Sequence, residues 1–217
     1  MKMEVRIENV TKVIQGNTVV DQVNLSMHSG KVIGLSGING SGKTMLMRLL
    51  SGMIFPTKGQ IWMNDKLLGK DIEFPESMGM LIENPAFLDG YSGIQNLKFL
   101  AGVQNRVGEK EIYETLKMVG LDPNSKKKYR KYSLGMKQRL GIAGAVLEQP
   151  ELLILDEPFN ALDTEGVMLT KKLITREKTR GALVVLTCHD SHILEELADE
   201  IHYMENGKVI KSEKKEE

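Results

Sequence analysis

A short glycine-rich segment of the chain has the residue types and the spacing needed to bind phosphate groups. Residues 37–44 read Gly-Ile-Asn-Gly-Ser-Gly-Lys-Thr and match the pattern G-x-x-x-x-G-K-[ST]. The glycines allow a tight turn whose N–H groups converge on an anion, the lysine reaches the outer phosphates, and the threonine hydroxyl ligates Mg²⁺. The predicted binding residues are Gly37, Asn39, Gly40, Ser41, Gly42, Lys43 and Thr44, and Lys43 is also a candidate catalytic residue.

The residues on either side of this segment predict the elements that position it. Residues 31–36 form a short apolar run, which is typical of a buried strand, and residues 43–50 are typical of a helix. The N-terminus of that helix would face the phosphates. An ordinary glycine-rich turn is the alternative, but it does not require a strand before it and a helix after it.

Two adjacent acids follow a second apolar run. Residues 152–155 are all apolar, as in a strand buried on both faces, and Asp156 and Glu157 come directly after them. Ligands of a parallel α/β sheet bind at this end of the strands. Asp156 can hold Mg²⁺ directly or through water, and Glu157 can accept a proton from an attacking water. A solvated strand end is the alternative, and the phosphate-binding segment argues against it.

A third segment resembles a known family. Residues 132–140 read Tyr-Ser-Leu-Gly-Met-Lys-Gln-Arg-Leu and are similar to the signature motif, LSGGQ, of ATP-binding-cassette (ABC) ATPases. Ser133 and Gly135 match the motif, whereas Leu134 and Met136 replace its first glycine and its glutamine. Ser133 is a candidate N-cap, so its hydroxyl and the first-turn N–H groups could bind an anion. The resemblance implies that this anion is the γ-phosphate of ATP held by a second copy of the domain.

Two further segments complete the resemblance, which covers nearly all of the chain. Residues 160–163 are similar to the D-loop of the family, and residues 186–190 to its switch histidine, which places these roles on Asp163 and His189. The resemblance implies a Mg²⁺-dependent ATPase in which His189 assists catalysis. It further implies that two cassettes, identical or different, close around two ATP molecules and drive an integral membrane permease.

Two positions depart from the usual pattern of the family. Glu83 stands where the family has a glutamine near Mg²⁺ and the attacking water, so it is a candidate metal-site residue. Together with the signature sequence, it is similar to the branch that serves bacitracin resistance and lantibiotic immunity. Glu83 could also replace glutamine with no change of role. Ile14, or Val13, falls where an aromatic residue stacks on adenine, and an aliphatic side chain lacks the aromatic stacking energy.

Composition restricts the remaining function classes. Lys+Arg and Asp+Glu both number 29, and the pI is about 6.9, which argues against a nucleic-acid binder. The N-terminal residues have no apolar core of a signal peptide, and no apolar run approaches the ~20 residues that span a bilayer. We therefore expect a cytoplasmic protein, peripheral at the inner face of the cell membrane. Cys188 lies near two histidines without the spacing of a zinc site and is expected to be a small packing residue.

The predicted fold is an α/β P-loop cassette with a mostly parallel core sheet, in one domain over residues 1–217. Residues 1–36 should contain an antiparallel β-subdomain and the phosphate-loop strand, residues 84–145 a helical subdomain, and residues 211–217 a disordered tail. Further helices are predicted at 92–103, 109–119, 164–178 and 190–198, strands at 59–63 and 182–187, and a hairpin around Asn206 and Gly207.

The predicted function is to power a separate permease that exports a peptide antibiotic or another amphipathic compound. A cassette that acts as a mechanical switch on a membrane or soluble partner, without cargo, is the alternative. A basic run of residues is explained by neither hypothesis. Residues 126–131 read Lys-Lys-Lys-Tyr-Arg-Lys, which is expected to be a solvated loop, a contact for anionic lipid headgroups, or a segment that steers nucleotide.

Overall fold

Two long strands form an antiparallel hairpin at one end of the molecule. The computed structural model describes residues 3–215, and in it β1 (Glu4–Ile14) pairs with β2 (Asn17–His28). The side chains Val5, Ile7 and Val10 are buried, with an irregularity in the pairing between Ile7 and Val10. Strands β4 (Lys58–Met63) and β5 (Lys66–Leu67) extend the hairpin into a sheet with the order β2-β1-β4-β5.

The second sheet is mostly parallel and has the order β10-β9-β3-β8-β7-β6. Its strands are β3 (Val32–Ser36), β6 (Met78–Leu81), β7 (Leu152–Leu155), β8 (Leu183–Thr187), β9 (Glu200–Glu205) and β10 (Lys208–Lys214). All pairs are parallel except β9 with β10. Every residue of β7 and β8 is buried, as expected for parallel strands that are covered on both faces.

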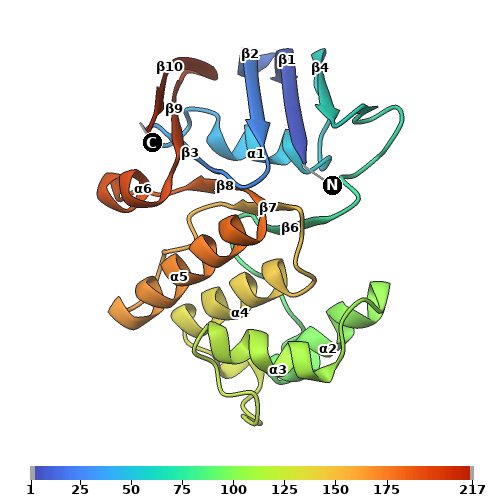
Figure 1. Cartoon of the computed structure of the whole chain (residues 1–217), viewed down its shortest axis with the longest axis vertical. Coiled ribbons are helices and arrows are strands. Elements are labelled where there is room, and N and C mark those ends of the chain that lie inside the picture. The colour runs from blue at the N-terminus through green and yellow to red at the C-terminus, as the bar shows by residue number, and fades with distance from the viewer. Residues whose placement is uncertain (1–2, 216–217) are drawn as a thin grey trace.

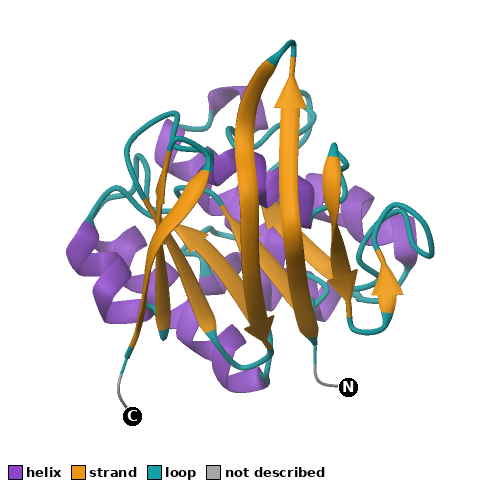
Figure 2. Ribbon diagram, turned by 90° about the horizontal axis from the view of Figure 1, so that it is seen from above, coloured by secondary structure: helices purple, strands orange, loops and turns teal. Residues whose placement is uncertain are grey.

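The helices divide the molecule into layers (Figure 1). Helix α1 (Lys43–Leu50) lies between the two sheets, and its residues Leu46 and Leu49 belong to the apolar core there. A second apolar core lies on the opposite face of the parallel sheet. The helices on that side are α2 (Gly93–Gln104), α3 (Glu109–Met118), α4 (Leu134–Val146), α5 (Thr164–Arg180) and α6 (Ser191–Leu197), with the 3-10 turn η1 (Tyr129–Lys131). Viewed from above, the antiparallel hairpin crosses over the strands of the second sheet (Figure 2).

Side-chain caps that the sequence contains begin several of these helices. Ser92 caps α2 in a capping box with Gln95, and Ser133 and Asp190 cap α4 and α6 with their side chains. The predicted hairpin is also confirmed as β9 and β10. Its turn residues Asn206 and Gly207 both have positive φ, 48° and 79°, as a two-residue hairpin turn requires. No helix in the described part of the chain is long and apolar enough to span a bilayer.

Two expectations about the ends of the chain need correction. Within residues 1–36, β3 joins the parallel sheet, and the antiparallel sheet recruits β4 and β5 from beyond residue 36. The disordered tail predicted from residue 211 is wrong for residues 211–214, which belong to β10. Backbone pairing with β9 and an ion pair between Lys214 and Glu200 at 3.1 Å hold this strand. Residues 216 and 217 lie outside the described residues.

Candidate functional site

The phosphate-binding segment forms the turn between β3 and α1. Gly42 precedes the first residue of α1 with φ 105°, and Gly37 has φ 150°. A Cβ on Gly37 would lie 2.3 Å from the carbonyl oxygen of Met204, and one on Gly42 would lie 2.7 Å from that of Val19. Both positions therefore require glycine, for space as well as for backbone conformation.

Lys43 lies over this turn and is 92% buried, with 8% of its surface exposed. Its Nζ donates to the carbonyl oxygens of Gly37 at 2.6 Å and Ile38 at 3.0 Å. A lysine held in this way is a positioned cation beside the turn. The cavity next to it, called the phosphate cavity here, measures about 340 Å³. It is lined by Val19, Asn39, Gly40, Gly42, Lys43, Thr44, Met45, Asp156, Glu157 and His189.

The first acid of the pair connects three elements. Asp156 follows β7, is 8% exposed, and accepts hydrogen bonds from Thr44 Oγ1 at 2.7 Å and from Thr187 Oγ1 at 2.6 Å. A carboxylate and a hydroxyl are hard oxygen ligands of the kind that Mg²⁺ prefers, and Mg²⁺ usually keeps waters and substrate phosphates as its other ligands. The pair Thr44 and Asp156 therefore fits this ion. No group of three or more His, Cys, Asp or Glu side chains suited to a metal occurs in residues 3–215.

The second acid is held on several sides. The backbone of Glu157 has φ 50°, its N–H donates to Thr187 Oγ1 at 2.8 Å, and its carbonyl oxygen accepts from Gln138 Nε2 at 3.1 Å. Its carboxylate accepts from the His189 N–H at 3.0 Å and lies 3.6 Å from Nε2 of the same histidine. Burial raises the pKa of Glu157, and the neighbouring His189 partly opposes this shift. A carboxylate with a raised pKa is suited to accept a proton.

Sequence reasoning did not give a role to Thr187 or Gln138, although both lie in segments that it singled out. The hydroxyl of Thr187 joins the two acids, because it donates to Asp156 and accepts from the backbone of Glu157. The only signal in the sequence was its place at the end of the predicted strand 182–187, two residues before His189.

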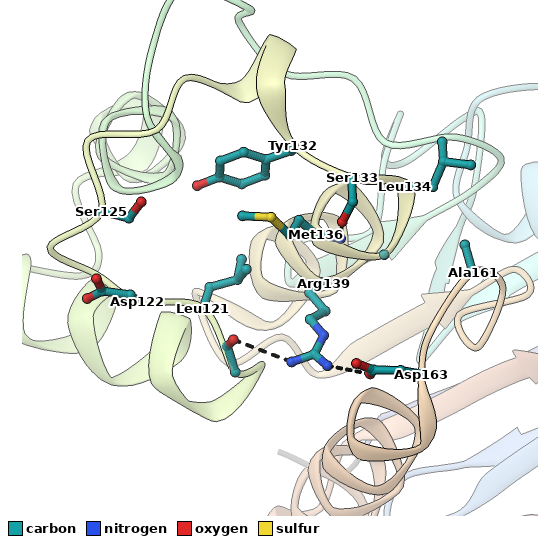
Figure 3. Close-up of a pocket in the computed structure, with 12 residues that line it drawn as sticks. Leu121, Asp122, Ser125, Tyr132, Ser133, Leu134, Met136, Arg139, Ala161 and Asp163 are labelled. Carbon is teal, nitrogen blue, oxygen red and sulfur yellow. Dashed lines mark hydrogen bonds and ion pairs between the residues drawn. The ribbon is translucent and has the colours of Figure 1, made fainter.

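A second cavity, called the signature cavity, contains the predicted residues of the third segment (Figure 3). It measures about 600 Å³ and is lined by residues that include Ser133, Gly135 and Asp163. Ser133 Oγ accepts from the N–H of Met136 at 3.2 Å and so caps α4. A Cβ on Gly135 would lie 2.7 Å from the carbonyl oxygen of Ala161, so this glycine allows close packing of α4 against the loop before α5.

One arginine organises the wall of the signature cavity. Arg139 on α4 forms an ion pair with Asp163 at 2.5 Å (Figure 3). It also donates to the carbonyl oxygens of Val119 and Gly120, both at 3.3 Å. Asp163 also caps α5 by accepting from the N–H of Gly166 at 2.9 Å. This N–H and then Arg139 lower the pKa of Asp163.

The structure does not bring every predicted site residue together. Ser133, Gly135 and Asp163 line the signature cavity and not the phosphate cavity. Glu83 does not line the phosphate cavity either. It has φ 59° and forms an ion pair with Arg48 of α1. Ile14 is half-buried near the β1–β2 turn, and Val19 of β2 lines the cavity instead.

Several known proteins are similar in sequence to this chain. A family model described as ABC transporter matches residues 20–160. An uncharacterised ABC transporter ATP-binding protein of Bacillus subtilis, YybJ, is 42% identical over 97% of this chain and 96% of its own length. The bacitracin transport ATP-binding protein BcrA of Enterococcus faecalis is 36% identical, over 97% of this chain and 69% of its own. The lantibiotic transport ATP-binding protein SrtF of Streptococcus pyogenes is 35% identical, over 94% and 88%.

Solved structures show the same fold. An ATP-binding subunit of an ABC transporter superimposes with a TM-score of 0.87 at 24% identity, over 97% of this chain and 89% of that chain. A dimeric cassette bound to ADP and Pi in a post-hydrolysis state superimposes with a TM-score of 0.84 at 24% identity, over 97% and 98%.

Proposed function

The chain is an ATP-binding and ATP-hydrolysing cassette of the ABC transporter family, and from this premise we propose that two copies close head to tail around two ATP molecules. The observation that carries the proposal is the separation of the two cavities. Lys43 and Glu157 line the phosphate cavity, whereas Ser133 lines the signature cavity. The two cavities share no lining residue. A second copy would supply the signature residues to each nucleotide.

Exposed apolar side chains support the same arrangement. Ile38 in the phosphate-binding turn is 75% exposed, and Leu134 at the start of α4 is 74% exposed. In a single cassette, each candidate site therefore exposes a large aliphatic side chain to solvent. Closure of two copies would cover both, and burial of a side chain of this size contributes about 1.5–3 kcal/mol.

The contacts assign a part of the reaction to each residue. The phosphate-binding turn and Lys43 would hold the triphosphate, and Lys43 would exchange the carbonyl oxygens of Gly37 and Ile38 for phosphate oxygens. Thr44 and Asp156 would hold Mg²⁺, which neutralises charge on the outer phosphates. Glu157 would accept a proton from the attacking water, with His189 beside its carboxylate.

The names of the relatives support a cargo and a partner. Two of them are named for transport of bacitracin and of a lantibiotic, and both are named as ATP-binding proteins. We therefore assign this cassette to a transporter that exports a peptide antibiotic or a similar amphipathic compound. Its membrane permease would be a separate chain, and the cassette would lie at the inner face of the membrane.

The test is size-exclusion chromatography with light scattering on the Glu157→Gln protein, with and without Mg-ATP. The expected result is a monomer without nucleotide and a dimer with Mg-ATP. The Lys43→Ala variant in the same background is the matched control and should stay monomeric, because it loses the phosphate contact. A monomer under all conditions, with ATP bound, would overturn the closure of two identical copies.

A further inference from the structure

The basic segment, residues 126–131, is a local cluster of positive charge. Its charged residues are Lys126, Lys127, Lys128, Arg130 and Lys131. In the described part of the chain, none of them forms an ion pair with a carboxylate. Other lysines do, for example Lys66 with Glu76 and Lys98 with Glu109. The excess charge is local, because the whole chain has a formal net charge of zero.

The surrounding loops reduce this charge only in part. Asp89 and Asp122 lie in those loops, and neither is ion-paired with the basic segment in the described structure. Lys137 of α4 adds a further cation, with its Nζ 5.0 Å from the centre of the Tyr129 ring. The partial positive charge at the N-terminus of α4 has the same sign. The segment and the start of α4 therefore form one positive surface.

The backbone of the basic segment is fixed. The N–H of Tyr129 donates to the carbonyl oxygen of Tyr91 at 2.8 Å, and its hydroxyl donates to that of Pro85 at 2.5 Å. Lys128 forms a β-bridge with Ser92. Tyr129 is 4% exposed, so its ring holds the turn η1 in place while the cations on both sides remain on the surface. Because the backbone is already ordered, only the exposed side chains would lose entropy when the segment meets a polyanion.

The segment borders the signature cavity at both of its ends. Ser125 precedes it, Tyr132 follows it, and both line that cavity. The Lys127 ammonium also donates to Sδ of Met136, another lining residue, at 3.6 Å. The charge is therefore placed on the rim of the site that Ser133 and Gly135 form.

We propose that the basic segment attracts the ATP-loaded face of a second copy of this chain and speeds closure onto the signature cavity. The partner is a polyanion, the triphosphate that the second copy presents. The inference rests on the proposed closure of two copies, and it adds the residues that determine how fast the two copies associate. Steering by such a patch raises association rates and weakens with salt.

The test measures the rate of Mg-ATP-driven association by stopped-flow light scattering on the full chain carrying Glu157→Gln, which keeps ATP uncleaved. Lys126→Gln, Lys127→Gln and Lys131→Gln are added together, and all three side chains are exposed. We expect the association rate constant to fall about fivefold to tenfold at low salt, with the dissociation rate unchanged. The difference should vanish near ~1 M salt, where the Debye length is about 3 Å.

The matched control is Lys58→Gln, Lys70→Gln and Lys110→Gln, which removes the same charge from exposed lysines without ion pairs elsewhere in the described structure. It should change the association rate less than about twofold. Arginine in place of Lys126, Lys127 and Lys131 should restore the rate, which separates a loss of charge from a loss of folding. Equal association rates for the test and control variants would overturn the proposal.

Two other results have a defined meaning. If the basic-segment variant associates normally but no longer binds vesicles that contain phosphatidylglycerol, the segment contacts lipid and the proposal is wrong. If the parent Glu157→Gln protein binds Mg-ATP but never associates, closure of two identical copies is wrong, whatever the charge of the segment does.

Discussion

Thr187→Val should reveal how much of the catalytic geometry depends on one buried hydroxyl. Thr187 is fully buried, its Oγ1 donates to Asp156 at 2.6 Å, and it accepts from the N–H of Glu157 at 2.8 Å. Valine has nearly the same shape, so the substitution removes both hydrogen bonds and leaves little cavity. Only the chemistry of the position changes.

The expected loss of stability follows from these two bonds. A hydrogen bond to a charged group contributes about 1.5–3 kcal/mol, and a buried N–H left without a partner costs about 1–3 kcal/mol. Asp156 keeps its bond from Thr44, which limits its loss. We expect the free energy of unfolding to fall by about 2–4 kcal/mol, which corresponds to about 5–15 °C in Tm for a chain of this size.

The expected effect on catalysis falls on kcat. The Glu157 backbone has φ 50°, and the bond to Thr187 is one of the contacts that hold it there. Without that bond the carboxylate should shift, and a displacement of about 1 Å can lower kcat by ~10²-fold. The phosphate-binding turn is untouched, so KM for ATP should change little. Both parameters come from a steady-state ATPase assay.

Thr187→Ser is the control, because serine keeps a hydroxyl at the same place. It should retain most of the activity and most of the Tm. If Thr187→Val equals Thr187→Ser in kcat and in Tm, the hydroxyl does not position Glu157, and the geometric argument for the acid pair fails.

Four further substitutions test other parts of the site. Glu157→Gln should keep ATP binding and slow hydrolysis by ~10²–10⁴. Burial raises the pKa of Glu157 in the folded protein, so ionisation of this group lowers the free energy of unfolding as the pH rises from its unfolded to its folded pKa. Glu157→Gln removes this cost, so the variant should be stabilised, relative to the parent, more at neutral pH than in acid. Thermal melts at both pH values measure this difference. Ser133→Ala should lower ATPase activity without weakening ATP binding to the monomer, and weaker monomer binding in titration calorimetry would contradict its action on a second copy. Glu83→Gln should alter the Mg²⁺ dependence of hydrolysis. Arg48→Met removes the ion-pair partner of Glu83 and should alter the Mg²⁺ dependence in a related way. An unchanged Mg²⁺ titration in both variants would show that Glu83 only replaces a glutamine.

The sequence predicted the parts of the site that depend on neighbours in the chain. The turn at residues 37–44 and the acids after β7 depend on a local strand, turn or helix, and the structure places Lys43, Asp156 and Glu157 around one cavity. The caps at Ser133 and Asp190 were equally local. In each case, a residue type with a specific backbone requirement stands where the hydrophobic pattern changes.

Features that depend on pairing between distant segments were not predictable in the same way. Thr187 contacts Asp156 because β7 and β8 are neighbours in a parallel sheet. The local sequence of neither strand predicts which strands will be neighbours. The tail at residues 211–214 looked disordered because it is charged, yet it pairs with β9 and its charges find partners such as Glu200. Backbone hydrogen bonds to a preformed edge overrode composition there.

Helix α4 connects the two cavities of one chain. Ser133, which we assign to the nucleotide of a second copy, caps its N-terminus, and the helix then carries two adjacent side chains with different contacts. Gln138 donates to the carbonyl oxygen of Glu157, and Arg139 pairs with Asp163. A displacement of α4 would therefore change the contact to Glu157 and the contact to Asp163 together.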